Sequence, residues 1–416
     1  MSYPFPVSVS VDFSTTPLFG VGFSLDDAVH GLLDVSSLGD SAAVVVDVSS
    51  TTNSANIKGG YNLLTDQFEA TICQLRIYDP NGDWNPQNTS SPYYGKLIPN
   101  RKIRISAQWG GLPIYLFSGY ANSYTYSYPK DQLVGFVSIV CADAFRLFQL
   151  SNVTTIAGAV AGQSTGARIN AILDAISWPA SMRVIDTGDT LCQADPGTLR
   201  TALSALKIIE ATEQGAFYID GSGNAVFKSR SKIQVADGAA PITYFNNNGT
   251  AIGYADVTFA HDDKLIINQT TVTNVGGTAQ TSADAASITK YFPHSINFNN
   301  LLSQTDADAL RIAQLYTATR KETSIRIDNI KLDLTTPGYS AGITAALTLD
   351  YFNTVSITSN TQGATAITKV LQIMGNEYDI TPTTFAATFT TSAVIASALI
   401  LDSPLYGVLD TSVITY

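Results

Sequence analysis

The sequence is poor in charge. Only 14% of its 416 residues are Asp, Glu, Lys or Arg, below the roughly 25% of ordinary soluble domains. Acidic residues exceed basic ones, 34 against 23, and the formal net charge is −11. Because phosphate binding requires Lys and Arg, this balance argues against a nucleic-acid-binding surface. It is compatible with nucleic acid that passes by without binding, because an acidic wall repels phosphates.

Cysteine is also scarce. Cys73, Cys141 and Cys192 form an odd-numbered set, and no CxxC pair occurs. Neither a disulfide framework nor a zinc cluster is therefore predicted. We expect three buried free thiols in a protein made in a reducing cytosol.

Targeting and membrane segments are missing. The opening residues, MSYPFPVSVSVDF, have no basic segment and no long apolar run, so no signal peptide is predicted. No stretch approaches the roughly 18 uninterrupted apolar residues of a membrane span. We expect no membrane insertion.

Catalytic and metal-binding motifs are missing as well. No HExxH, Walker A or GxGxxG pattern occurs. The three histidines, His30, His261 and His294, are far apart in the sequence. His261-Asp262-Asp263 is the one local cluster of metal-capable residues, and a solvated turn is favoured there over a metal site.

Two groups of carboxylate residues are candidate sites. Glu210 and Glu213 are one helical turn apart, and we interpret them as solvated side chains of a helix face, with a catalytic pair as the alternative. Asp79, Asn81 and Asp83 alternate as calcium ligands do, but a Gly falls at the fourth position and no distal Glu follows, so a plain turn is favoured. We predict a protein that is not an enzyme, with no catalytic, cofactor-binding or metal-binding residues and no cofactor.

The first 150 residues read as a β-rich domain. Strands are predicted where residues alternate or are β-branched between turn residues: VSVSVDF, AVVVDVSS, IRISAQW, PIYLFSGYANSYTYSY and LVGFVSIVCADAF. Tyr124, Tyr126 and Tyr128 fall on one strand face by the two-residue period. Cross-strand aromatic packing is the favoured interpretation of these tyrosines, and a sugar-binding platform is the alternative.

Residues 151–235 read as a small α/β domain. One helix is predicted from Ser164 or Thr165 to Pro179, with an apolar stripe of Ile169, Ile172, Leu173 and Ile176. A second is predicted within residues 197–215. Its stripe is Leu199, Leu203, Leu206 and Ile208 or Ile209, and its C-cap is Gly215. A hairpin follows, with its turn at Asp220-Gly221-Ser222-Gly223.

Residues 236–392 read as a second β-rich domain. One helix is predicted in it, Ser303–Arg320, with Asp306 and Asp308 in the first turn. Strands are predicted in YADVTFAHDDKLIINQTTVTNVGG, SITKYFPHSINF, IRIDNIKLDL, TAALTLDYFNTVSIT, ATAITKVLQIMGNEYDIT and TFAATFTT.

A short pattern, L-D-x-x-(V/L)-x-G-x-L-D, occurs at residues 25–34 and again at 401–410. It is either a chance match or a pair of equivalent docking segments. We therefore assign residues 393–416 to a C-terminal docking segment.

The most specific stretch is Asn62–Ile105. It comprises a predicted strand (Glu69–Tyr78), an Asx/Gly turn, a long loop that contains Pro86, Pro92 and Pro99, and a second strand (Lys102–Trp109). It resembles the signature of minor tail and tail-hub proteins of long-tailed phages and prophages. The matching positions are Asp79, Gly82, Trp84, Pro86, Asn88, Ser91, Pro92, Tyr93, Gly95, Leu97, Pro99, Arg101, Ile103 and Arg104.

The resemblance continues through LFSGYANSYTYSYP, VSIVCADAFRLF, the α/β region and ITKVLQIMGNEYDITPTTFAATFTTS, from about Leu25 to Ser392. It implies a mainly β fold with an inserted α/β domain, in which residues 1–150 and 236–392 form two β-barrel-like hub domains related by pseudo-symmetry. Three subunits would form a ring at the virion tail tip, after assembly in the host cytoplasm.

The resemblance also implies partners. These are the distal tail protein, the tape-measure protein, and tail fibre or spike proteins, with DNA only in transit during ejection. A carbohydrate-binding tail-tip adhesin is the alternative, suggested by the tyrosine tract with Trp84, Tyr93 and Tyr94. A cell-wall hydrolase has only scattered carboxylates in its favour.

Overall fold

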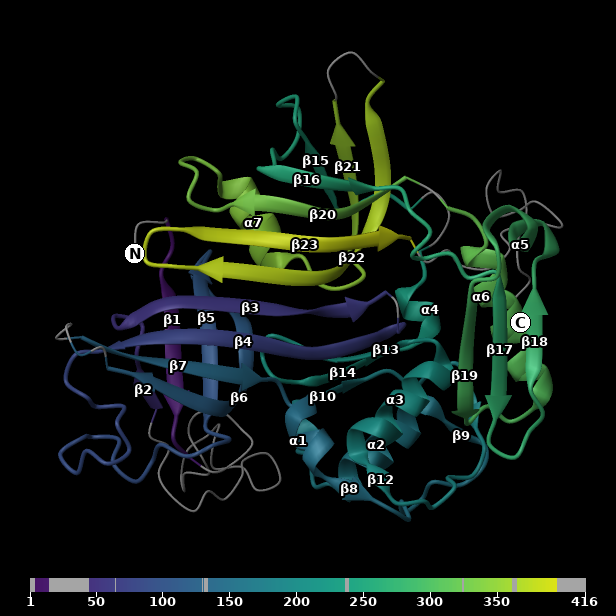
Figure 1. Ribbon diagram of the computed structural model, residues 1–416, viewed down its shortest axis with the longest axis horizontal. Helices are drawn as coiled ribbons and strands as arrows, with labels where there is room; N and C mark the ends of the chain where they lie inside the picture. Colours follow the sequence, from purple (N-terminus) through teal and green to yellow (C-terminus); the bar gives the residue numbers. More distant parts are fainter. Residues whose placement is uncertain are drawn as a thin grey trace.

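The computed structural model describes residues 4–14, 45–63, 65–128, 130, 134–235, 239–323, 325–360 and 365–394. Of these residues 43% lie in strands and 19% in helices, which confirms a mainly β fold with inserted helices (Figure 1). Across those ranges no helix is long and apolar enough to cross a membrane. Both copies of the L-D-x-x-(V/L)-x-G-x-L-D pattern lie outside the described residues, as does the docking segment beyond residue 394.

One open sheet of 13 strands forms the body of the molecule. Seven strands come from the first β-rich region: β1 (Val7–Asp12), β2 (Val45–Asp47), β3 (Thr52–Asn62), β4 (Gln67–Asp79), β5 (Lys102–Trp109), β6 (Leu112–Ser127) and β7 (Gly135–Ala142). Six come from the second: β15 (Thr243–Asn246), β16 (Asp256–Ala260), β20 (Arg326–Asp333), β21 (Thr354–Ser359), β22 (Ile367–Ile380) and β23 (Phe385–Ala393). The order is β16-β20-β23-β22-β3-β4-β7-β6-β5-β1-β2, with β21 on β22 and β15 on β21.

The two β-rich regions are continuous through the pair β3–β22. These strands run antiparallel with Gly60 opposite Gly375 and Ala55 opposite Ile380. Each strand would otherwise leave an unpaired edge, and pairing satisfies its backbone groups. No closed barrel is found in the described residues, so the expected barrel closure does not appear there. The domain boundaries at residues 150, 235 and 392 stay predictions. The pseudo-symmetry between the two β-rich domains stays a prediction as well.

The core is built from the inward-facing residues of these strands. Ile57, Leu75, Ile77, Phe385 and Phe389 are each 0–1% exposed. Burying such a side chain contributes roughly 1.5–3 kcal/mol. The three cysteines are buried and unbridged, as predicted, and Cys73 lies opposite Cys141 on adjacent strands β4 and β7.

Residues 145–233 form the helical insertion. Its elements are α1 (Phe145–Leu150), β8 (Asn152–Val153), β9 (Gln163–Ser164), α2 (Thr165–Ala175), a 3-10 turn (Ala180–Met182), β10 (Arg183–Ile185), β11 (Leu191–Cys192), β12 (Arg200–Thr201), α3 (Ala202–Glu213), β13 (Ala216–Ile219), β14 (Ala225–Lys228) and α4 (Arg230–Ile233). Strands β10, β14 and β13 form one small sheet. The predicted hairpin is confirmed as β13 and β14.

Side-chain caps set where both long helices of this insertion begin. The Ser164 hydroxyl accepts a hydrogen bond from the Ala167 N–H at the start of α2, as predicted. Helix α3 starts later than predicted, because the Thr201 hydroxyl accepts from the Ser204 N–H. Leu199 therefore precedes the helix and is exposed. The left-handed C-cap residue is Gln214 and not the expected Gly215.

A second insertion is a three-stranded sheet with one long helix. It comprises β17 (Gln269–Asn274), β18 (Gln280–Ala283), α5 (Ala285–Tyr291), β19 (Ser295–Leu301) and α6 (Asp306–Arg320). Helix α6 confirms the predicted helix, with Asp306 and Asp308 in its first turn and a capping box between Thr305 and Asp308. The strand predicted from SITKYFPHSINF is wrong in its first half, because Asp284 caps α5 there.

The strand predicted from TAALTLDYFNTVSIT is also wrong in its first half. Residues Ser340–Thr348 form α7. Alanine favours helix, and the buried Ile343 and Leu347 have helical spacing. The Tyr378 hydroxyl donates to the Ala346 carbonyl at 3.1 Å, which joins α7 to the large sheet.

Candidate functional site

The motif loop between β4 and β5 is a compact turn. The Asp79 carboxylate accepts hydrogen bonds from the N–H groups of Asp83 (2.8 Å) and Trp84 (3.2 Å). The Tyr128 hydroxyl donates to the same carboxylate at 3.0 Å. These three bonds hold the residues that follow β4 in a turn. Within the described ranges no group of three or more His, Cys, Asp or Glu side chains could hold a metal ion.

The rest of this loop is fixed by packing and internal hydrogen bonds. Trp84 is 3% exposed and lies 5.3 Å from the Tyr93 ring, which stacks on Phe13. The Ser91 hydroxyl donates to the Asp83 carbonyl. Tyr94 is 52% exposed. The loop therefore presents an aromatic side chain from a rigid base.

In the tyrosine tract, Tyr124 and Tyr126 of β6 follow the packing interpretation, whereas Tyr128 lies just after β6 and is 49% exposed. Tyr124 and Tyr126 are half-buried and pack against the hydrophobic core. Burial raises the pKa of both phenols, and the Tyr124 hydroxyl donates to the Ile98 carbonyl at 3.3 Å. Burial and the adjacent Asp79 raise the pKa of Tyr128 to about 12.

The turn interpretation of His261-Asp262-Asp263 is also confirmed. Both oxygens of Asp262 accept hydrogen bonds from the Arg326 guanidinium, at 2.8 and 2.9 Å. These bonds lower the pKa of Asp262 to about 2. Arg326 and Asp262 stabilise the start of β20, and His294 Nε2 lies 3.8 Å from a carboxylate oxygen of Asp263.

Glu210 and Glu213 are not solvated, which corrects the sequence interpretation. Their exposed fractions are 1% and 0%. Sequence spacing holds the signal that was missed: Glu210 and Glu213 follow Leu206 and Ile209 by four residues each, on the apolar stripe of α3.

Glu213 connects three segments of the helical insertion. Oε2 accepts from the Thr165 hydroxyl at 2.8 Å and the Thr190 N–H at 2.9 Å. Oε1 accepts from the Asp189 N–H at 2.9 Å and the Arg230 N–H at 3.2 Å. The carboxylate thus serves as an acceptor for the starts of α2 and α4.

Glu210 connects the insertion to the large sheet. It accepts from the Phe217 N–H at 2.9 Å and the Phe68 N–H at 3.5 Å. Lys207 pairs with it at 2.8 Å and donates to the Phe68 carbonyl. Burial raises the pKa of Glu210, and Lys207 partly opposes that shift. The two glutamates face different partners, and each serves as a hydrogen-bond acceptor that joins segments of the fold.

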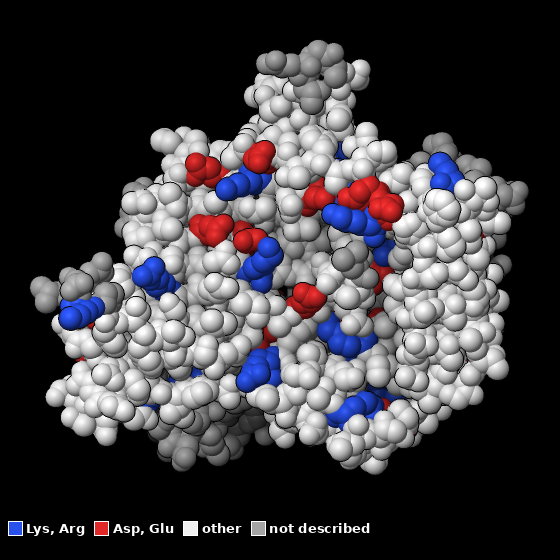
Figure 2. All heavy atoms as spheres, viewed as in Figure 1, with Lys and Arg blue, Asp and Glu red and all other residues white. Residues whose placement is uncertain are grey.

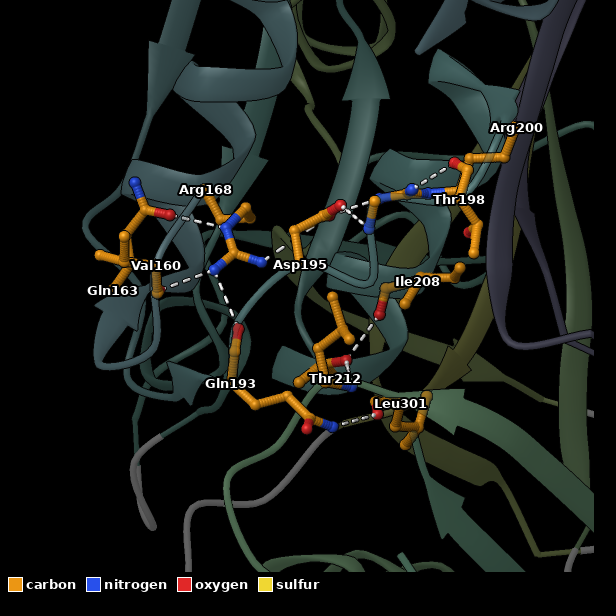
Figure 3. A network of polar contacts seen from close by, with 12 residues as sticks. Val160, Gln163, Arg168, Gln193, Asp195, Thr198, Arg200, Ile208, Thr212 and Leu301 are labelled. Atoms are coloured by element: carbon orange, nitrogen blue, oxygen red, sulfur yellow. Dashed lines mark hydrogen bonds and ion pairs between the residues drawn. The ribbon is translucent and has the colours of Figure 1, made fainter. Parts of the chain in front are cut away.

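Arg168 lies at the centre of a further polar network (Figure 3). Its side chain is 0% exposed and donates to Gln163 Oε1 at 2.6 Å and to the carbonyls of Val160 and Gln193 at 2.9 Å. Asp195 lies between Arg168 and Arg200. Burial lowers the pKa of Arg168.

The same network reaches the second insertion. The Gln193 amide donates to the Leu301 carbonyl at the end of β19 at 3.3 Å. The Thr212 hydroxyl accepts from the Leu302 N–H at 3.0 Å. The two insertions are therefore joined by directional bonds as well as by apolar packing.

A buried ion pair joins the second insertion to the large sheet. Arg320, at the end of α6, contacts Asp66 in the β3–β4 turn at 2.7 Å, and the Asp66 side chain is 0% exposed. Sequence reasoning had no signal for this pair, because the two residues are 254 positions apart.

A cavity of about 170 Å³ lies between the large sheet, α7 and the turn after β13. It is lined by residues of β4, β6, β13, α7 and β22 and by the carboxyl of Asp143. Asp143 accepts from the N–H groups of Thr71 (2.7 Å) and Phe145 (2.9 Å). Complete burial raises its pKa to about 7 despite these bonds. Sequence reasoning missed Asp143 as well.

The fold is similar to that of solved structures of other proteins. Neither a protein-family model nor a curated protein sequence matches the chain. Among solved structures, it is similar to the tail protein from Neisseria meningitidis MC58, with a TM-score of 0.57 and 12% identity over 94% of this chain and 98% of that one. It is also similar to the 43 kDa tail protein of prophage MuSo2 from Shewanella oneidensis, with a TM-score of 0.54 and 12% identity over 84% of this chain and 96% of that one. These likenesses confirm, at the level of the fold, the resemblance seen in the sequence.

Proposed function

We propose that this chain is a structural protein of a phage tail and forms a ring at the tail tip. One observation carries the proposal: the fold matches that of a tail protein over nearly the whole length of both chains. A match that covers the large sheet and both insertions is more specific than a likeness confined to one common domain, although fold alone does not imply function.

In this proposal three copies form the ring. It joins the tail tube and distal tail protein to fibres or a spike, contacts the tape-measure protein, and lets DNA pass at ejection. The low charge of the chain supports this role, because hydroxyl and amide groups cost less to desolvate at subunit contacts than charges do. The acidic balance supports a channel to which DNA does not adhere.

A scaffold that is not an enzyme agrees with the use of the buried carboxylates. Glu213, Glu210 and Asp143 accept hydrogen bonds from backbone N–H groups that would otherwise lack partners. We do not extend the proposal to a sugar-binding adhesin, because Trp84 is buried and Tyr124 and Tyr126 pack against the core.

Gene deletion and tagged complementation in the phage test the proposal. Without the gene we expect particles that lack complete tails, and the tagged chain should label one end of complemented tails. Purified tails that are complete without the chain, or a label confined to the capsid, would contradict it.

A further inference from the structure

Asp143 stands where the chain enters the helical insertion. Strand β7 ends at Ala142 and α1 begins at Phe145, so Asp143 belongs to the two-residue connection between them. Its carboxyl group accepts a hydrogen bond from the Thr71 N–H on β4 at 2.7 Å and another from the Phe145 N–H at 2.9 Å. One side chain therefore bridges the large sheet and the insertion. We call this contact of Asp143 with Thr71 and Phe145 the joint.

A cavity adjoins the joint. Asp143 and Thr71 both line this space of about 170 Å³, and Asp143 is only 2% exposed. A single water molecule needs roughly 10–15 Å³ of such space, so the cavity has room for several. A carboxylate that turned away from its two N–H donors would therefore find space for hydration without unfolding of the insertion.

Acidic and phenolic groups surround the joint. The titratable groups that face it are Tyr115 and Tyr120 of β6, Asp220 after β13, Asp350 and Tyr351 after α7, Tyr378 of β22, and Lys207 of α3 with its partner Glu210. The charged residues of β4 and α1 next to the joint, Glu69 and Arg146, are exposed. Lys207 is the cation among the groups that face the joint, and its pairing with Glu210 at 2.8 Å already compensates its charge.

Ionisation of Asp143 is unfavourable while the joint is closed. Burial raises the pKa of Asp143 to about 7, although the N–H groups of Thr71 and Phe145 and the charge of Lys207 lower it. Above that pH the closed joint holds a buried anion in a cavity that Asp220 and Asp350 also line. A buried charge without a counter-charge of its own is costly, so the closed joint should be more stable at pH 6 than at pH 8.

We propose that the joint is a proton-controlled hinge: when the Asp143 carboxyl gives its proton to solvent, the side chain turns into the cavity and frees the start of α1 from β4. The inference does not depend on the function proposed above. Other contacts keep the insertion on the sheet, because Lys207 donates to the Phe68 carbonyl and the Ser118 hydroxyl donates to the Gly221 carbonyl. The opening is therefore local.

The size of the effect follows from the two states of the carboxyl. The pKa of Asp143 is about 7 in the closed joint and about 3.9 for a hydrated Asp side chain. The ratio of open to closed joint should therefore rise about tenfold between pH 6 and pH 8. Most of that rise falls below pH 7, because above it the carboxyl is ionised in both states.

Other groups that titrate in this range lie away from the joint. Histidine is the side chain that ordinarily titrates between pH 5 and 8. His261 follows β16 and His294 precedes β19, and neither lines the cavity; His30 lies outside the described residues. Figure 2 shows acidic and basic side chains of the surface in small mixed groups and not in a dense charged field. We therefore attribute a pH response of the joint to Asp143.

Hydrogen exchange of the intact chain, followed by mass spectrometry, tests the proposal. Rates are measured between pH 6 and pH 8 and divided by the intrinsic exchange rate at each pH. Segments that contain the Thr71 and Phe145 amides should lose about tenfold in protection, and the loss should level off above about pH 7. In Asp143→Asn the protection should not change with pH, because the side chain no longer ionises.

Two variants control for the other carboxyl groups of the cavity. Asp350→Asn removes a side chain that is 57% exposed, and Asp220→Asn removes one that Asn224 already holds with two hydrogen bonds. Both should keep the tenfold response of the wild type. The β17 segment of the second insertion serves as an internal reference, and its normalised protection should be the same at both pH values.

Equal normalised protection of the wild-type joint at pH 6 and pH 8 would overturn the inference. So would a tenfold loss that persists in Asp143→Asn or disappears in Asp220→Asn, because the response would then belong to another group. Should Asp143→Asn fail to fold, the wild-type profile still decides: a loss that continues to grow tenfold per pH unit above pH 7 contradicts the hinge.

Discussion

Removing the Glu213 carboxylate should destabilise the helical insertion more than removing any exposed charged side chain of that insertion. In Glu213→Ala, the N–H groups of Asp189, Thr190 and Arg230 and the Thr165 hydroxyl lose their acceptor. At roughly 1–3 kcal/mol for each buried donor left without a partner, the sum is about 4–12 kcal/mol. Water that enters the space left by the side chain can satisfy some of these donors. We therefore expect a loss of about 3–5 kcal/mol, a large part of the 5–15 kcal/mol typical of a folded protein.

Urea unfolding followed by tryptophan fluorescence measures this loss. Trp178 is buried in the same insertion, with its ring edge against Phe148 at 5.0 Å, so it reports on the unit that Glu213 holds together. With a slope of roughly 2–3 kcal/mol per molar urea, the midpoint should fall by about 1–2 M.

Asp174→Ala is the matched control for Glu213→Ala. Asp174 is a helix carboxylate whose side chain is 69% exposed and paired with Arg183. Such a pair contributes at most about 1 kcal/mol, so the midpoint should shift by less than about 0.5 M. If Glu213→Ala shifts the midpoint no further than this control, the role assigned to Glu213 is refuted.

Three further predictions concern the other junctions. Burial raises the pKa of Asp143 to about 7, above about 3.9 in the unfolded chain, so the folded state binds the extra proton and stability contributed by Asp143 falls as pH rises from about 4 to about 7. Asp143→Asn should flatten that part of a urea-midpoint profile against pH, and a profile parallel to wild type would refute the assignment. Arg320→Met should cost about 3–5 kcal/mol because Asp66 is left buried without its partner, whereas adding Asp66→Asn should recover part of the loss in a double-mutant cycle; strictly additive losses would argue against the pair. Replacing Pro86, Pro92 and Pro99 together with Ser should reduce ring assembly, measured as oligomer mass, before it lowers the melting temperature, and unchanged assembly would count against the loop as a subunit contact.

Local signals in the sequence predicted the elements that local forces determine. Helix α2 begins at the cap that Ser164 provides, and α6 begins with acids in its first turn, because both depend on residues within one turn. Strands β4 and β5 were predicted from residue alternation alone. Helix α7 was missed because Thr- and Ala-rich residues run into a true strand, and only packing against the large sheet decides between the two states.

Long-range contacts explain what the sequence could not predict. The pairing of β3 with β22 joins residues more than 300 positions apart, and nothing in either strand specifies the other. The sequence suggested that Glu210 and Glu213 are solvated, because the N–H groups that donate to them lie on other segments of the chain. Their place on the apolar stripe of α3 was the one available sign that they are buried.

A reconstruction of the intact tail tip tests the central proposal most directly. We predict density for this chain in a threefold ring at the end of the tail tube, around an open channel. A tail tip that contains no copy of this chain, or that holds it outside any ring, would contradict the account.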